Sequence, residues 1–229
     1  QVSSIRPSMR GKLDVMIKGN STMADQTEQY FGLFFEVRPK TGRRQDYFDH
    51  VDILKPVLAR HDGLLWLQRY ASADQDDLIL SHQLWASETA LAGWRRDTKH
   101  RRSQQAGMTT IFADYRIRVG PRLWHWHTDK NAETNLVNTL DPTFTKTPLI
   151  LALYSHTAPD ADQLARLGTI TGHYTAFAAE EADVLLFNPT APLEALPTII
   201  AQTGAVMASL FGVSRDYGLF DRAAAPQAR

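Results

Sequence analysis

The chain contains no cysteine. It therefore has no disulfide framework, no thiolate nucleophile and no cysteine metal site. Its charges leave no surplus of either sign, because 25 Lys and Arg residues balance 25 Asp and Glu residues. No apolar run approaches the ~20 residues that a membrane-spanning helix requires. We therefore expect neither nucleic acid nor a membrane as a partner.

Several catalytic signatures are also missing. The sequence has no GxGxxG, GxxxxGK[ST], GxSxG or HExxH motif, so dinucleotide, P-loop, α/β-hydrolase and zincin chemistry lack support. Residues 1–22 are polar and basic, without the apolar stretch of about 7–15 residues of a secretory signal. We expect this segment to be a tail outside the fold, and the protein to be cytoplasmic.

A chain of 229 residues with 43% hydrophobic residues suits two globular domains of about 100–150 residues each. We expect a first domain over 23–122 and a second, smaller domain over 148–222. The polar segment 123–147 would link them, and 223–229 would form a second tail.

The first half alternates strands and helices. Residues 30–38 place apolar side chains at every second position, which predicts a strand. Residues 45–60 have the three- and four-residue spacing of an amphipathic helix, interrupted near Pro56. Residues 64–70 and 78–84 then predict a strand hairpin.

A second helix should begin after Ser87, a suitable N-cap, and run to about Ala106. Gly107 would end it in a left-handed conformation, and Ile111–Val119 would be the returning strand. The order β-α-β-β-α-β is that of a ferredoxin-like (αβ-plait) unit, an α+β fold.

The second half predicts a smaller α+β unit, which could also be ferredoxin-like. We expect strands over 149–156 and 182–189, helices over 159–179 and 193–203, and a last strand within 206–220. No residue-level repeat relates the two halves strongly enough to indicate duplication.

Four segments carry a family resemblance: HDGLLWLQRY, LWASETALAGW, KHRRSQQAG and FADYRIRV. Over residues 30–119 the chain resembles the antibiotic biosynthesis monooxygenase (ABM) family of the dimeric α/β-barrel superfamily. The resemblance implies homodimers that pair through their sheets, and a pocket between helices and sheet. It also implies oxidation of aromatic compounds without metal or flavin, with no cofactor.

One branch of that family binds and degrades haem, using an Asn on the first strand, a Trp on the second helix and a His further along it. Trp94 matches the Trp, but His100 comes one turn, about 5.4 Å, too early. Leu33-Phe34-Phe35-Glu36 lacks the Asn. Because two of the three features do not match, haem binding or degradation is only the alternative to oxidation without a cofactor.

Trp94 and His100 are the predicted catalytic residues. His is the natural group to accept a phenolic proton near neutral pH, and Trp94 would be an apolar pocket wall. In one continuous helix, six residues place them about 120° apart, so they would border one cavity without stacking. Alternatively, Trp94 is core and His100 lies on a solvated basic face.

The remaining candidates are predicted substrate-binding residues. Arg95 could meet a carboxylate, as could Arg101. Nine residues separate Trp85 from Trp94, which would point them to opposite sides of the helix start. The predicted substrate-binding residues are Trp66, His82, Trp85, Arg95 and Phe35.

His125 and His127 would project together from a strand as half a metal site, but no suitable third ligand follows. We therefore predict no metal. The leading hypothesis is a cofactor-independent monooxygenase acting on a small aromatic or hydrophobic metabolite. A non-catalytic small-molecule-binding or stress-associated dimer is a further alternative.

Overall fold

The computed structural model describes residues 29–128 and 147–226, which form two consecutive α+β units. The first unit comprises eight elements, followed here in chain order: β1 (Phe31–Pro39), α2 (Arg44–Leu58), β2 (Leu64–Ser72), β3 (Ile79–Trp85), α3 (Glu88–Arg96), α4 (Thr98–Ala106), a π-helical turn (Gly107–Ile111) and β4 (Phe112–His127).

The second unit follows with β5 (Leu149–Ser155), α5 (Ala161–Leu167), β6 (Gly168–Ala176), β7 (Asp183–Pro189), a 3₁₀ turn (Leu193–Ala195), α6 (Leu196–Ile200), β8 (Met207–Gly212) and β9 (Arg215–Gly218). Both units have the ferredoxin-like strand order, β4-β1-β3-β2 in the first and β8-β5-β7-β6 in the second. The two units are therefore topological copies.

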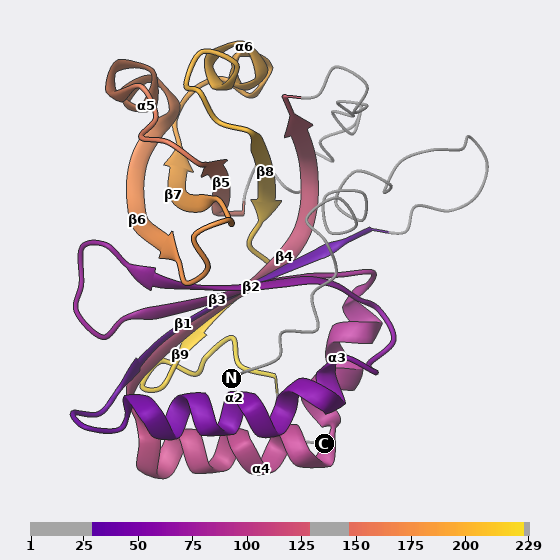
Figure 1. Cartoon of the computed structure of the whole chain (residues 1–229). Helices are drawn as coiled ribbons and strands as arrows, with labels where there is room; N and C mark the ends of the chain where they lie inside the picture. Colours follow the sequence, from indigo (N-terminus) through magenta and orange to yellow (C-terminus); the bar gives the residue numbers. More distant parts are fainter. Residues whose placement is uncertain (1–28, 129–146, 227–229) are drawn as a thin grey trace.

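The two sheets join at both edges. Tyr70–Ser72 of β2 pairs with Tyr174–Ala176 of β6, and Arg122–His127 of β4 pairs with Met207–Phe211 of β8. Since β1 also pairs with β4, the strands from β1 to β4 in the sheet order close into a barrel within one chain, and β9 lies outside the ring along β4. The helices of the two units lie at opposite outer sides of this barrel (Figure 1).

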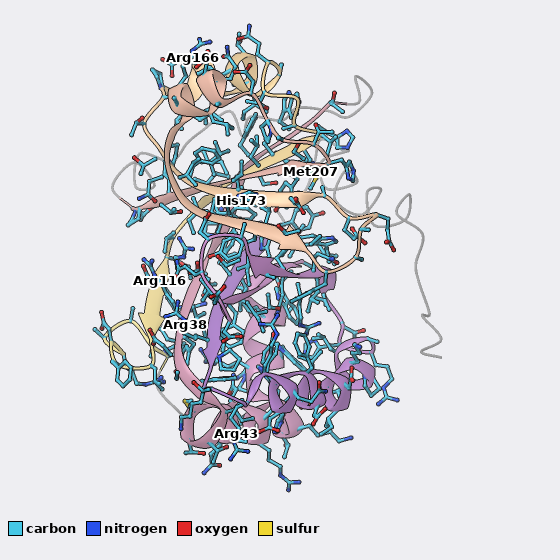
Figure 2. All side chains as sticks on the ribbon, turned by 60° about the vertical axis from the view of Figure 1, so that its left-hand side comes forward. Arg38, Arg43, Arg116, Arg166, His173 and Met207 are labelled. Atoms are coloured by element: carbon cyan, nitrogen blue, oxygen red, sulfur yellow. The ribbon has the colours of Figure 1, made fainter. Side chains whose placement is uncertain are left out.

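Alternating side chains sort into an interior and two outer layers. The barrel interior is filled from both units, by Phe34, Trp66, Tyr70, Leu80, Tyr154, Tyr174, Leu186 and Phe211 among others. The helices of each unit cover the outer face of their own strands, with Trp85, Leu91 and Trp94 on the first unit and Leu151, Phe187 and Ile200 on the second. In Figure 2, Arg43 and Arg166 mark these two helical ends, with the strands between them.

The predicted second helix is in fact two helices. Asp97 takes an extended ψ of 133° between α3 and α4, and its carboxylate accepts hydrogen bonds from the backbone N–H groups of Lys99 and His100. It thus caps a new helix, which an aspartate does well. Ser87 caps α3 as predicted, accepting from the Ala90 N–H.

The predicted left-handed cap at Gly107 is wrong. Gly107 has φ −54° and ψ −54°, and the chain continues into the π-helical turn. A Cβ here would lie 2.3 Å from the Phe112 ring, so the need for glycine comes from a close approach.

Two further predictions are corrected. Residues 123–127 of the expected linker belong to β4, whose extension pairs with β8; the rest of that linker, apart from 128 and 147, lies outside the described residues. The helix predicted over 159–179 ends at Leu167, where Gly168 has φ +151°, and β6 follows. The segment TITGHYTA is rich in β-branched residues and pairs on both edges, which overrides the helical spacing.

The described part of the chain contains no helix that is both long and apolar enough to cross a membrane. Of the two predicted tails, 1–22 lies outside the described residues, as do residues 227–229 of the second, whereas 223–226 are described.

Gly120 tests the closure of the barrel. A Cβ built on it would lie 1.5 Å from the Gly212 carbonyl oxygen, where β4 passes the end of β8. We expect Gly120→Ala to lower the free energy of unfolding by about 3 kcal/mol, because the backbone must move apart. Gly93→Ala is the matched control, since its nearest contact is 3.6 Å and alanine favours a helix. Equal denaturation midpoints for the two variants would contradict this account.

Candidate functional site

A cavity of about 1140 Å³ lies between the first unit's helices and the outer face of its sheet. Successive side chains of a strand point to opposite faces of the sheet, and those on the outer face form the floor of the cavity. They are Leu33 and Phe35 of β1, Ser81 and Gln83 of β3, and Ile117 and Val119 of β4. Helices α2, α3 and α4 cover it, with side chains that include Val51, Leu54, Leu91, Trp94, His100 and Arg101. This is the position that the family resemblance predicts for a pocket.

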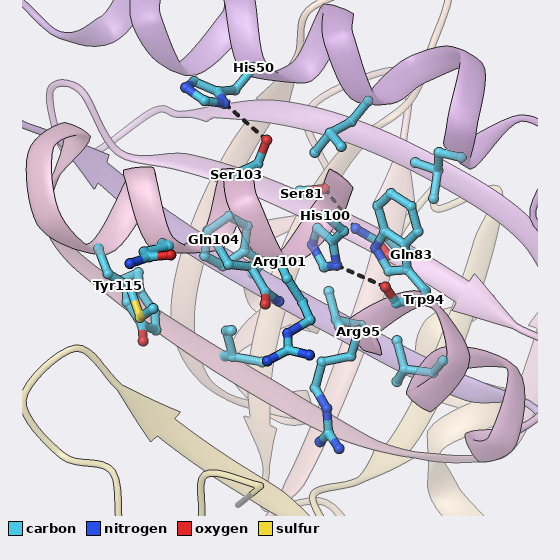
Figure 3. Close-up of a pocket in the computed structure, with 18 of the residues that line it drawn as sticks. His50, Ser81, Gln83, Trp94, Arg95, His100, Arg101, Ser103, Gln104 and Tyr115 are labelled. Atoms are coloured by element: carbon cyan, nitrogen blue, oxygen red, sulfur yellow. Dashed lines mark hydrogen bonds between the residues drawn. The ribbon is translucent and has the colours of Figure 1, made fainter. Parts of the chain in front are cut away.

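Trp94 and His100 meet inside this cavity. Their rings stack, with centroids 4.1 Å apart and planes inclined by 14° (Figure 3). The prediction that they would not stack is wrong, because it assumed one continuous helix, whereas the extended backbone at Asp97 divides the segment into α3 and α4. The two predicted catalytic residues thus form one unit on the cavity wall.

The hydrogen bonding of His100 fixes its tautomer. Nδ1 lies 3.0 Å from the Trp94 carbonyl oxygen, which can only accept, so Nδ1 carries the proton. In the neutral ring Nε2 is then the basic nitrogen. Burial lowers the pKa of His100 to about 4, against the opposing effects of the Trp94 carbonyl and of Asp97. The imidazole is therefore neutral at physiological pH.

Trp85 supports the site from behind. It is fully buried, does not line the cavity, and stacks at 6.5 Å on Trp94. The prediction of opposite directions is wrong because Trp85 lies on β3 and only Trp94 lies on the helix. Trp85 Nε1 donates to Gln83 Oε1 at 3.0 Å, and Gln83 Nε2 donates to Ser81 Oγ at 3.2 Å, which orients the polar floor.

Trp66 and His82, predicted as substrate-binding residues, lie on the opposite face of the sheet, inside the barrel. His82 stacks on Phe34 at 4.1 Å. Its Nδ1 donates to the Leu33 carbonyl, and its Nε2 accepts from the Tyr154 hydroxyl at 2.6 Å. Burial lowers the pKa of His82 to about 3, so it is a neutral core residue. The strand register, which the sequence does not fix, places the side chains of Trp66 and His82 on the barrel-facing side of the sheet.

The cavity also has polar residues that sequence reasoning missed. At one end His50 Nδ1 and Ser103 Oγ are 2.9 Å apart (Figure 3). Arg95 and Arg101, the predicted anion-binding residues, both line the cavity, as does Phe35. Arg215, Tyr217 and Arg222 join them from beyond β8. No spacing in the sequence predicts that these three residues line the cavity, because their position depends on the pairing of β9 with β4.

His125 and His127 are the two histidines that the sequence places together on a strand. His125 Nδ1 is hydrogen bonded to Ser209 Oγ at 2.9 Å, across from β8, and burial lowers its pKa to about 3. Across residues 29–128 and 147–226, no three His, Cys, Asp or Glu side chains are grouped to hold a metal ion.

The tautomer and burial of His100 predict its titration. In histidine-detected NMR, His100 should titrate at about pH 4, assigned by its loss in His100→Gln. Since the unfolded residue takes up a proton near pH 6.5 and the folded one near 4, His100 should make stability fall as pH drops through this interval. Replacement by Gln should flatten that part of the stability profile. A measured value of 6 or above would contradict the buried, neutral ring.

Comparison with known proteins relates part of this chain to one family. The family model described as "Antibiotic biosynthesis monooxygenase" matches residues 31–106. The "Jasmonate monooxygenase ABM" of Pyricularia oryzae is 34% identical over 90 residues, which are 39% of this chain. The chain spans 42% of the length of that relative.

Solved structures of similar proteins cover less than half of the chain. A putative antibiotic biosynthesis monooxygenase from Nitrosomonas europaea has a TM-score of 0.39 at 10% identity, covering 44% of this chain and 96% of its own. Protein PA3566 from Pseudomonas aeruginosa has a TM-score of 0.39 at 13% identity, covering 43% and 99%. Residues 31–106, from β1 to α4, thus match the family model of the antibiotic biosynthesis monooxygenases, and β4 completes the ferredoxin-like order of the unit that contains them.

Proposed function

We propose that the protein is a cofactor-independent monooxygenase acting on a small aromatic or hydrophobic metabolite. The observation that carries this proposal is the neutral His100, stacked on Trp94 in the cavity with Nε2 as its basic nitrogen. The cavity volume of about 1140 Å³ suits a molecule of metabolite size.

The chemistry needs only the substrate, dioxygen and a base. Nε2 of His100 takes a proton from a phenol, an enol or a carbon beside a ketone, leaving an electron-rich anion. The anion gives electrons to dioxygen and forms a C–O bond, and the protonated imidazole returns its proton to the peroxide. Loss of water from this hydroperoxide leaves a C=O group. One oxygen atom enters the product and the other leaves as water, so no external reductant is consumed.

The low pKa of His100 sets a requirement on its surroundings. A phenol of pKa about 10 loses its proton to a base of pKa about 4 only at a cost of about 8 kcal/mol. The site must therefore stabilise the anion. Arg101 supplies positive charge and Ser81 supplies a hydroxyl, both on the cavity lining. The substrate anion would in turn raise the pKa of His100.

The name of the relative suggests a substrate class. That protein is called a jasmonate monooxygenase, and a jasmonate is a small cyclic ketone with one carboxylate. An apolar floor of Leu33, Ile117 and Val119 beside cationic side chains fits such a molecule. The ketone would provide the acidic carbon that the mechanism requires.

The proposed assembly differs from the homodimer that the resemblance implies. The strand edges through which two such units would close a barrel are those of β2 and β4, and β6 and β8 of the same chain already occupy them. We propose that one chain is the functional unit and that any homodimer forms through another surface.

Oxygen uptake tests the proposal directly. With jasmonate or a phenolic substrate as reductant, we expect His100→Ala to reduce kcat about 100- to 10,000-fold, which is the usual contribution of a general base. Lys99→Ala is the control, because Lys99 is an exposed neighbour that does not line the cavity. Oxygen uptake at background across a panel of phenols, quinols and cyclic ketones would instead favour a non-catalytic binding protein.

A haemin titration addresses the alternative cofactor. The first strand presents Leu33 and Phe35 to the cavity and has no asparagine. We therefore expect no Soret band from the wild-type protein above that of His100→Ala. A saturable band that depends on His100 would overturn the assignment of a cofactor-free site.

A further inference from the structure

Strand β9 and the segment after it bring side chains into the cavity from outside the matched domain. Arg215 is in register with Val119 and Tyr217 with Ile117, so all four share the face that forms the cavity floor. Arg222 follows from the segment 219–226, and its guanidinium donates to the Tyr115 hydroxyl. In Figure 1 the yellow end of the chain, which includes β9, lies on the side of the sheet that carries α2 and α4.

These residues make one wall of the cavity strongly cationic. Burial raises the pKa of the Tyr217 phenol, while the nearby positive charges of Arg215, Arg95 and Arg222 oppose that rise. The Tyr217 hydroxyl therefore remains a neutral hydrogen-bond donor at physiological pH. The three arginines come from α3, β9 and the last segment, and converge at this wall.

The described residues balance this charge only in part. Arg215 pairs with Glu88 at 2.7 Å, but Glu88 is about half exposed and the Arg215 Nε is buried without a partner. The partner of Arg222 is a phenol, which carries no charge to offset it. Asp216, next to Arg215 in the sequence, pairs with Arg116 at 2.6 Å, and Asp221, next to Arg222, accepts a hydrogen bond from the Ala223 N–H. Cations that border an apolar cavity in this way favour an anionic ligand.

We propose that Arg95, Arg215, Arg222 and the Tyr217 hydroxyl bind the carboxylate of a small hydrophobic acid. The apolar body of that acid extends across the cavity toward Trp94 and His100. This inference rests on the proposed function for the role of the cavity, and it restricts the substrate class to monoanionic acids. It also assigns substrate selection to β9 and the segment 219–226, which lie outside the matched domain.

Binding of an acid and of its methyl ester tests the proposal, because the ester keeps the shape and loses the charge. The probes are jasmonate with methyl jasmonate and indole-3-acetate with its methyl ester, titrated against the full chain by calorimetry. We expect at least one acid to bind about ten times more tightly than its ester. Arg215→Ala and Arg222→Ala should each weaken the acid about 10- to 100-fold and leave the ester unchanged.

Three controls separate recognition from folding. Lys99→Ala removes an exposed cation outside the cavity and should change neither ligand. Asp216→Ala loosens β9 through its pair with Arg116, and Arg215→Lys keeps the positive charge, so both should preserve the preference for the acid. Thermal denaturation of each variant verifies that it is folded.

The outcomes distinguish this inference from the proposed function. If neither acid binds more tightly than its ester, or if the arginine variants weaken both ligands equally, the carboxylate site is overturned. If the acid preference and its loss in Arg215→Ala are found while oxygen uptake stays at background, the carboxylate site stands and the oxygenase proposal fails.

Discussion

The closure of two four-stranded sheets into one barrel is the constraint on which the rest of the structure depends. It uses two junctions, β2 with β6 and β4 with β8, and both form within one chain. Aromatic and aliphatic side chains of both units fill the barrel interior. The cavity lies instead between the sheet and its covering helices, where α3 and α4 change direction.

Polar groups within the barrel connect the two halves. Arg118 Nη2 donates to Glu36 at 3.0 Å, and the Tyr174 hydroxyl of the second unit donates to the same carboxylate. His82 of the first unit accepts from Tyr154 of the second. Since an unpaired charge in such a place is costly, each half is incomplete without the groups of the other. The same side chains explain why His82 is a core residue, although its sequence context allowed a binding role.

The fold of the first unit could be predicted from its sequence because its signals are local. Period-two strands, the Ser87 cap and the ABM motifs all agree over residues 30–119. The site was only partly predictable. Trp94 and His100 were found together, but their stacking depends on one backbone torsion at Asp97. The faces of Trp66 and His82 depend on register, and Arg215 reaches the cavity through a strand pairing about 100 residues away in sequence. Pattern and propensity do not encode such long-range geometry.

Joining both halves in one polypeptide changes how the barrel responds to its surroundings. A barrel assembled from two separate chains obeys mass action and opens on dilution, whereas this closure is intramolecular and independent of protein concentration. In a homodimer every substitution occurs in both subunits, whereas the two halves of this chain have different sequences. Here a substitution in the half that bears α5 and α6 occurs once and has no copy in the half that bears His100. The two halves are thus free to take different roles.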